Sequence, residues 1–238
     1  MPGHVRFVLG VVVACASLAV YGEPMFRPFV ASFSVARGIM TLGELNLSLS
    51  LDGDGQYTYH AHTQPGMLAS WFSVDEITEE SRGRMNAETL TPENYLYRAS
   101  PDTEENTRIR FDWKSAKAYT TSSGVTWAQV ITPGVQDRLS QQLALRLHLA
   151  QGKRTVEYQV ADGGKLKRYR FQVVDEEPVK TPVGELPCLK VERSKEGRPA
   201  DYIIWFAPAL EYLPVKIERR KSGKRYRMVL EKVEGIPL

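Results

Sequence analysis

Apolar and polar residues alternate along most of the chain, which predicts β-strands. The alternation is clearest over residues 45–51, where every second residue is leucine and the residues between are polar. The turn sequence DGDG follows at residues 52–55, and glycine and aspartate suit positive φ angles. The alternation then resumes over residues 56–62. Residues 43–63 are therefore predicted to form a β-hairpin.

The same period of two recurs in several later segments, and two more hairpin turns are expected near the end of the chain. The segments are residues 109–113, 125–127, 156–160 and 169–173, and the turns are residues 208–211 and 221–224. Consecutive strands joined by short turns favour antiparallel pairing. We therefore expect a mainly β fold, either a curved antiparallel sheet or a half-open barrel.

One segment departs from this period and predicts a helix. Over residues 135–150, apolar residues stand three or four positions apart until Gly152 ends the pattern; they are Val135, Leu139, Leu143 and Leu147. We expect an amphipathic helix packed on the concave face of the sheet. Because no linker or repeat interrupts the pattern, residues 23–238 are expected to form a single antiparallel β domain.

Residues 1–22 are expected to be a signal peptide. An uncharged apolar run of 15 residues, 7–21, follows a weakly basic start and ends before Glu23. It is shorter than the roughly 20 residues that a membrane span requires. We expect cleavage after Gly22, with Ala19 as a competing position, a periplasmic location and no stable membrane span in the mature chain. A rival processing site is Cys15, which ends a lipobox-like sequence, VVAC, and would make the protein a lipoprotein.

Charge is distributed unevenly along the chain. Residues 75–105 hold nine acids and three bases, whereas residues 216–232 hold eight bases and two acids. The cations gather at the last predicted hairpin and include Arg219, Arg220, Lys221, Lys224 and Arg225. They either form a contact surface for anionic lipid or glycan, or protect an edge hairpin from aggregation. They lack the series of stacked aromatic residues typical of single-strand nucleic-acid binding, and export argues against it as well, so no nucleic-acid partner is expected.

A short apolar segment near residue 70 differs from the strands around it. It follows Pro65-Gly66 and shows no alternation, which favours a loop or helical turn at the mouth of the sheet. Its large side chains are candidates for contact with an apolar ligand. They are Met67, Leu68, Trp71 and Phe72.

The patterns that carry known chemistry are incomplete in this sequence. His60 and His62 share one face of a strand, but no third metal ligand lies near them in sequence. The DGDG turn lacks the glycine and glutamate of a calcium loop. Gly163-Gly164-Lys165 lacks the hydroxyl residue of a phosphate loop. We expect a non-enzymatic protein that needs neither a metal nor a cofactor.

Four stretches together carry a family resemblance. They are ITEESRG at residues 77–83, QDRLS at 136–140, TPVGE at 181–185 and WFAPALEYLPVKIE at 205–218. The chain resembles the domain of unknown function 3108 family, a group of uncharacterised secreted proteobacterial proteins. The resemblance implies an envelope location and a single β-rich domain, and it supplies neither an activity nor catalytic residues.

The leading hypothesis from the sequence is a periplasmic binding protein for an acyl chain or another apolar ligand of the envelope. Many alternating strands with only one helix to cover them would leave a concave apolar surface. The alternative is a structural or protein-interaction module of the envelope with a filled core. Its working surfaces would be the acidic region 75–105 and the basic region 216–232.

Overall fold

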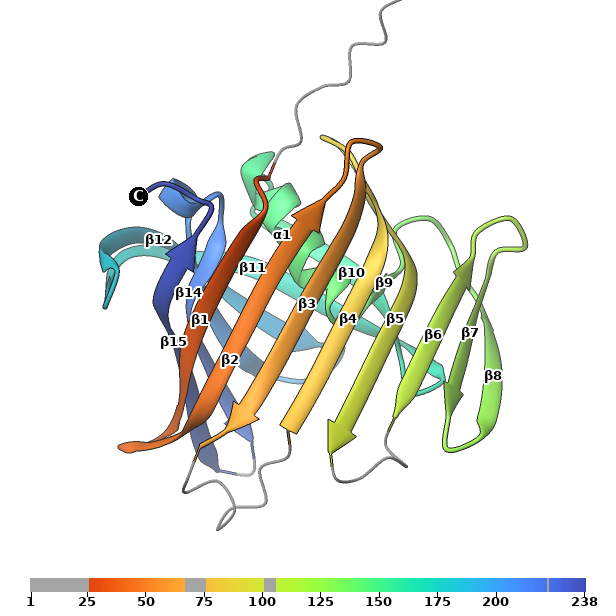
Figure 1. The fold of residues 1–238 in the computed structure, drawn as a ribbon, viewed down its shortest axis with the longest axis horizontal. Coiled ribbons are helices and arrows are strands. Elements are labelled where there is room, and N and C mark those ends of the chain that lie inside the picture. Colours follow the sequence, from red (N-terminus) through yellow and green to blue (C-terminus); the bar gives the residue numbers. More distant parts are fainter. Residues whose placement is uncertain (1–25, 67–75, 101–105, 222) are drawn as a thin grey trace, which may run out of the picture.

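The computed structural model describes residues 26–66, 76–100, 106–221 and 223–238. Within these residues fifteen strands form one sheet, in the order β8-β7-β6-β5-β4-β3-β2-β1-β15-β14-β13-β12-β11-β10-β9 (Figure 1). The strands are β1 (Phe29–Arg37), β2 (Met40–Leu51), β3 (Gln56–Pro65), β4 (Glu76–Met85), β5 (Leu90–Ser100), β6 (Thr107–Asp112), β7 (Lys117–Ser122), β8 (Val125–Val130), β9 (Gln136–Asp137), β10 (Thr155–Asp162), β11 (Lys165–Thr181), β12 (Gly184–Lys195), β13 (Ala200–Ala207), β14 (Leu213–Lys221) and β15 (Lys224–Glu234). The helices are α1 (Ser140–Ala150) and a 3₁₀ turn (Pro208–Leu210).

The mainly β fold predicted from the alternation is confirmed. The predicted hairpin at residues 43–63 corresponds to β2 and β3, which pair in antiparallel register. Its turn is fixed by Asp52, whose Oδ1 accepts the backbone N–H groups of Asp54 at 3.0 Å and Gln56 at 2.8 Å. Such a side-chain bond to nearby backbone is the reason aspartate favours turns.

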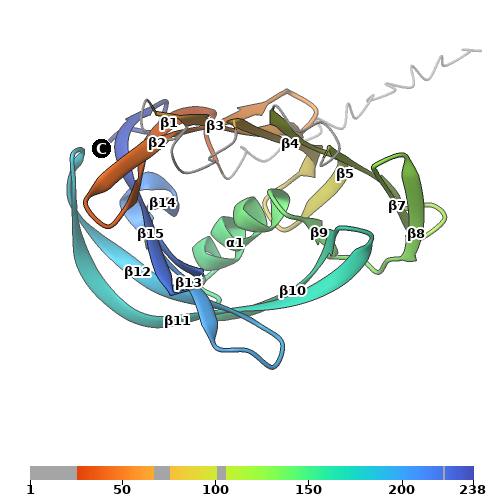
Figure 2. The ribbon, with the colours of Figure 1, turned by 90° about the horizontal axis from the view of Figure 1, so that it is seen from below.

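The sheet is strongly curved, and the first and last strands of the chain are neighbours in it. β1, the first strand of the chain, pairs antiparallel with β15, the last, in the middle of the sheet, whose edges are β8 and β9; the two halves of the sheet curl around α1 as a ring (Figure 2). Leucines of the helix and of the residue before it face the sheet and are buried, with at most 3% of each side chain exposed; they are Leu139, Leu143, Leu145, Leu147 and Leu149. The predicted packing of the helix inside the curve of the sheet is therefore confirmed, and the helix forms part of the core.

Side chains link the two ends of the curled sheet to other parts of it. Near one end, Gln136 of β9 donates from Nε2 to the carbonyl of Leu90 in β5 at 3.1 Å. Near the other, Gln129 of β8 donates to the carbonyl of Gly164 at 2.9 Å. Gly164 has a φ of 71°, and a Cβ there would lie 3.0 Å from the ring of Trp127. This turn therefore requires glycine on both conformational and steric grounds.

Helix α1 begins later than its sequence pattern predicts. The spacing of apolar residues predicts a helix from residue 135, whereas the helix begins at Ser140. Gln136 and Asp137 instead pair in parallel with Val160 and Ala161 of β10. Residues just before a helix can take extended backbone and still place apolar side chains in the core, so periodicity alone does not locate the start.

We expect Leu143→Ala to lower the free energy of unfolding by about 2–5 kcal/mol, because the side chain is fully buried between α1 and the sheet and its loss leaves a cavity. Urea denaturation followed by circular dichroism measures this change. Ile39→Ala is the control, since that side chain is fully exposed. Equal midpoints for Leu143→Ala and the control would show that the helix is not core.

Candidate functional site

A buried carboxylate holds the start of α1. Asp137 is fully buried, and its Oδ1 accepts the backbone N–H groups of Leu139 at 2.8 Å and Ser140 at 2.7 Å. In return, the Ser140 hydroxyl accepts the N–H of Asp137 at 2.9 Å. This reciprocal arrangement resembles a capping box placed just before the helix, whose N-cap is Leu139, and it satisfies backbone donors that would otherwise lack partners.

The same carboxylate connects the helix to the opposite side of the ring. Its Oδ2 accepts the hydroxyl of Ser81 in β4 at 2.7 Å, and Ser81 also bonds the Tyr57 hydroxyl of β3 at 3.1 Å. Ser81 and Tyr57 are buried like Asp137, and burial raises the pKa of the Asp137 carboxyl to about 6. A carboxylate, two serines and a tyrosine, all buried, thus anchor the start of the helix.

A second set of polar side chains lies next to the Asp137 network, on β4, β5 and the residue after Asp137. Tyr95 donates its hydroxyl to Glu79 of β4 at 2.5 Å, and the guanidinium of Arg138 lies 3.6 Å from the same carboxylate oxygen. Arg138 also stacks over the ring of Tyr97, 5.1 Å from its centroid. These contacts hold one arginine on the inner side of the sheet, just before α1.

Arginine and tyrosine alternate along a row on the concave face of neighbouring strands. Arg193 of β12 pairs with Tyr202 of β13, and Tyr202 pairs with Arg219 of β14. Each stands two residues from a core residue of its own strand, so all three face inward; those core residues are Val191, Ile204 and Ile217. The register therefore produces a cationic, aromatic row on the inner face.

Close stacking holds this row together. The Arg193 guanidinium lies 3.9 Å from the Tyr202 centroid and 4.7 Å from that of Tyr169, and Arg219 lies 5.1 Å from the Tyr202 centroid. Burial raises the pKa of the Tyr202 hydroxyl, while the positive charges of Arg219, Arg193 and Arg138 act to lower it. Arg193 and Arg219 thus stack on one tyrosine from the two neighbouring strands, and Arg138 acts on it through its charge alone. We call Arg138, Arg193, Tyr202 and Arg219 the concave cluster.

Two of the three arginines in the concave cluster have a carboxylate partner. Arg193 forms a bidentate pair with Asp201, at 3.1 and 2.6 Å, and Arg138 pairs with Glu79. Among the residues that the structure describes, Arg219 lies within ion-pair distance of no carboxylate. Arg219 is thus the arginine of the cluster that lies outside these ion pairs. A half-buried guanidinium without a counter-ion is suited to bind an anion.

The structure divides the cationic hairpin that the sequence indicates as one surface. Arg219 faces inward, whereas the adjacent Arg220 faces outward and pairs across the hairpin with exposed Arg225. Lys221 pairs with Lys224 at the end of the hairpin. Binding of anions by these residues stays a prediction.

The predicted apolar contact residues at the mouth of the sheet lie outside the described residues; they are Met67, Leu68, Trp71 and Phe72.

Sequence analysis missed Arg138, Arg193 and Tyr202 as site residues. A signal for Arg193 was present, because the alternation that places Val191 in the core also places Arg193 on the core-facing side of the strand. A charged residue at an inward position is unusual unless it is paired or functional. The convergence itself depends on pairing between strands that are distant in sequence.

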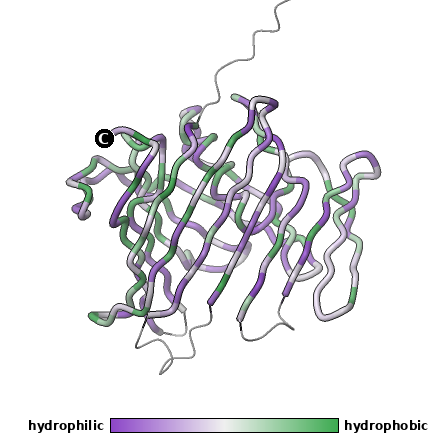
Figure 3. The backbone as a smooth tube through the Cα atoms, in the orientation of Figure 1, coloured by the Kyte–Doolittle hydropathy of each residue, from purple (hydrophilic) through white to green (hydrophobic). Residues whose placement is uncertain are grey.

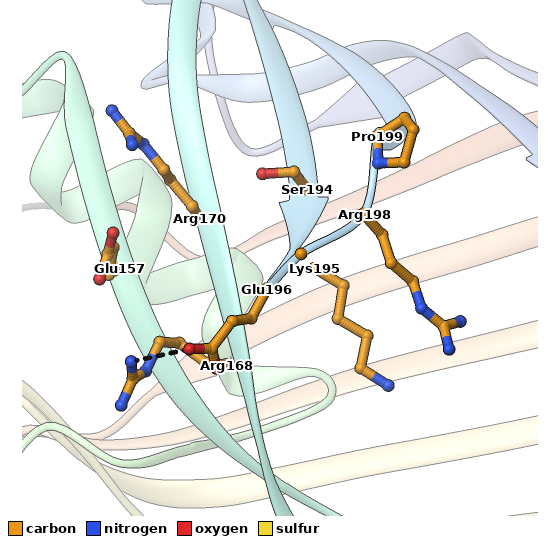
Figure 4. Close-up of a pocket in the computed structure, with 9 residues that line it drawn as sticks. Glu157, Arg168, Arg170, Ser194, Lys195, Glu196, Arg198 and Pro199 are labelled. Carbon is orange, nitrogen blue, oxygen red and sulfur yellow. Dashed lines mark hydrogen bonds and ion pairs between the residues drawn. The ribbon is translucent and has the colours of Figure 1, made fainter.

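Two hollows lie on the outside of the sheet, and their charged side chains do not stack on a shared aromatic residue as those of the concave cluster do. One, of about 450 Å³, is lined by residues that include Arg168, Arg170, Lys195 and Arg198. Their side chains point in different directions, and Arg168 is paired with Glu196 at 3.3 Å (Figure 4). The other hollow, of about 460 Å³, is also polar. The concave cluster is therefore the stronger candidate site.

The fold and this site define a β-barrel-like protein with a helix inside the ring. Its architecture is similar to the crystal structure of a β-barrel-like protein of domain of unknown function DUF1849 from Brucella abortus. The two share 12% identity with a TM-score of 0.58, covering 89% of this chain and 99% of that one. A likeness at this identity concerns the fold alone.

The chain belongs to the family described as Protein of unknown function (DUF3108), whose model matches residues 30–231. This confirms the resemblance seen in the sequence. The complex of MucA and MucB from Pseudomonas aeruginosa also matches, at 8% identity and a TM-score of 0.18, over 89% of this chain and 94% of that chain, which is too weak to support an argument. Curated proteins gave no match. In the described part of the chain, no helix is long and apolar enough to cross a membrane.

We expect the stability that depends on Asp137 to fall as pH rises from about 4 to about 6. The folded pKa of about 6 exceeds the unfolded value of about 3.9, so the folded state binds the proton more tightly. Protonation therefore stabilises the fold fully below about pH 4, and this contribution, about 3 kcal/mol, is lost as pH rises through the folded pKa. Asp137→Asn removes this dependence.

Urea denaturation of wild type and Asp137→Asn at several pH values measures the effect. The free energy of unfolding of the wild type, minus that of the variant, should decrease between pH 4 and 7. Asp54→Asn, in the exposed β2–β3 turn, is the control and should follow the wild type. A difference that is constant or increases with pH would contradict the assignment.

Proposed function

We propose that the protein is an exported, non-enzymatic binding protein that holds an anionic amphiphile against its concave cluster. The observation that carries this proposal is the inward-facing row of Arg193, Tyr202 and Arg219 across three neighbouring strands. Export is proposed from the signal-like residues 1–22. The non-enzymatic character is proposed because the hydroxyl and carboxylate network around Asp137 is excluded from solvent.

The concave cluster suits the anionic group of such a ligand. A guanidinium presents several N–H donors in one plane and matches the oxygens of a phosphate or carboxylate. Arg219 is half-buried, so its attraction to an anion is screened less by water than that of an exposed cation. The positive charge of Arg219 favours the same occupant.

The surroundings of the cluster suit a limited apolar portion of the ligand. Tyr202 and Tyr169 present ring faces beside the arginines, and Ile217 lies two residues before Arg219 in β14 on the same face. Beyond them, buried side chains of α1 fill the ring, including Leu143 and Leu147. A long acyl chain would have to displace these groups, so we propose contact by an apolar segment near the cluster.

A second candidate function is the protein-interaction module, and strand β8 favours it. β8 lies at one end of the sheet, and its sequence VTWAQV contains no charge and no proline. Val125, Trp127 and Val130 are exposed on it, Val130 at 74%. Proteins usually protect an open edge with charge or proline because it can pair with another strand. An extended segment of an envelope partner would fit this edge.

We expect decyl phosphate to bind the chain from Glu23 onward, which contains every described residue, and Arg219→Gln to weaken this binding at least about tenfold. The reason is that hydrogen bonds to a charged group contribute about 1.5–3 kcal/mol. Arg220→Gln is the matched control, because it removes the same charge from the neighbouring position on the opposite face. Isothermal calorimetry below the micellar concentration measures both variants.

Decyl maltoside, which has the same chain and no charge, should bind more weakly than decyl phosphate. Equal losses in Arg219→Gln and Arg220→Gln would indicate nonspecific attraction by net charge and contradict the concave site. No saturable binding of either compound would leave the interaction module as the better account of the protein.

A further inference from the structure

Two hairpin tips lie side by side at the end of the ring. The β1–β2 turn contains Gly38 and Ile39, and the other tip joins β14 to β15. Because β1 pairs with β15, Arg37 at the end of β1 lies opposite Tyr226 near the start of β15. Both tips project from the same end of the sheet, below β1 and β15 in Figure 1.

The first tip presents an apolar side chain to solvent. Ile39 is fully exposed, at 102% of its reference area, and Met40 beside it is half-buried. Figure 3 shows the tip of the β1–β2 hairpin as a hydrophobic stretch of chain. A large aliphatic side chain at the tip of a turn does not contribute to the core. Its transfer from water into an apolar environment would be favourable.

The second tip carries positive charges that no acidic residue in the same stretch of chain neutralises. Residues 219–230 contain six lysines and arginines and no acid. Arg220 lies directly opposite Arg225, and Lys221 lies opposite Lys224. Like charges directly opposite each other destabilise a pair of strands. An anionic surface against this hairpin would relieve that repulsion.

We propose that these two tips dock the protein onto a membrane surface that contains anionic phospholipid. The docking rim consists of Ile39, Arg220, Lys224 and Arg225, with the isoleucine entering the interface and the cations contacting headgroup phosphates. Docking would bring Arg219, one residue from Arg220 and on the inner face, close to the bilayer. The inference rests on the proposed function only in naming an amphiphile as the cargo.

Co-sedimentation of the chain from Glu23 onward with lipid vesicles tests the proposal. We expect binding to vesicles that contain phosphatidylglycerol with phosphatidylcholine, and little binding to phosphatidylcholine alone. Each basic residue near an anionic membrane contributes about fivefold in affinity, so Arg220→Gln with Arg225→Gln should weaken binding about 25-fold. Added salt should weaken it as well.

Two further variants separate the docking rim from general charge effects. Ile39→Asp should weaken binding to the mixed vesicles, because it removes the apolar contact and adds a negative charge. Arg82→Gln with Arg84→Gln removes two exposed cations from β4, where Arg84 lies opposite Gln56 beside the β2–β3 turn at the other end of the sheet. This control should leave binding unchanged. An equal loss in the control, or equal binding to both vesicle types, would overturn the proposal.

The outcomes also distinguish this inference from the proposed function. Arg219→Gln should weaken decyl phosphate binding at least about tenfold and vesicle binding by no more than about fivefold, because it removes one cation whose side chain faces the inside of the ring. If the wild type binds decyl phosphate but does not bind the mixed vesicles, docking alone is overturned. Vesicle binding without saturable decyl phosphate binding would overturn the amphiphile site alone.

Discussion

Arg146 of α1 lies fully buried inside the ring, and its guanidinium donates two hydrogen bonds, at 3.2 and 3.1 Å, to the backbone carbonyl of Glu211. The rings of Phe26 and Phe29 stack on it, at 4.5 and 4.9 Å. Glu211 has a φ of 52°, and its carboxylate accepts the N–H of Arg27 at 2.9 Å. One guanidinium therefore joins the helix, the turn before β14 and the start of β1. A buried charge is costly without its partners, so these three elements stay together.

The two ends of the ring consequently differ in the side chains that face its interior. Around Arg146 and the leucines of α1, side chains fill the interior and the polar groups serve to hold the helix. Toward the other end, beyond Asp137, the inward positions carry Arg138, Arg193 and Arg219. The residues that anchor the helix are thus separate from the concave cluster, which is compatible with the proposed binding of a ligand at the cluster while the helix stays in place.

Much of the fold was predictable because its main determinants are local. The leucine alternation of β2 defines a strand and its buried face, and the leucine spacing after residue 139 defines the helix. The concave cluster was not predictable as a unit, since Arg138, Arg193 and Arg219 meet only through the register of strands far apart in sequence. The cationic hairpin shows the same limit. Charge clustering identified it, but only strand alternation separates Arg219 from Arg220 into two faces with different roles.

A crystal structure of the protein with bound decyl phosphate would show where the anionic group binds. We expect phosphate oxygens within hydrogen-bond distance of the Arg219 guanidinium on the concave face, with the bonds from Arg146 to the Glu211 carbonyl retained. A phosphate bound only to the outward-facing Arg220 and Arg225, or a helix α1 displaced from the ring by the alkyl chain, would contradict this expectation.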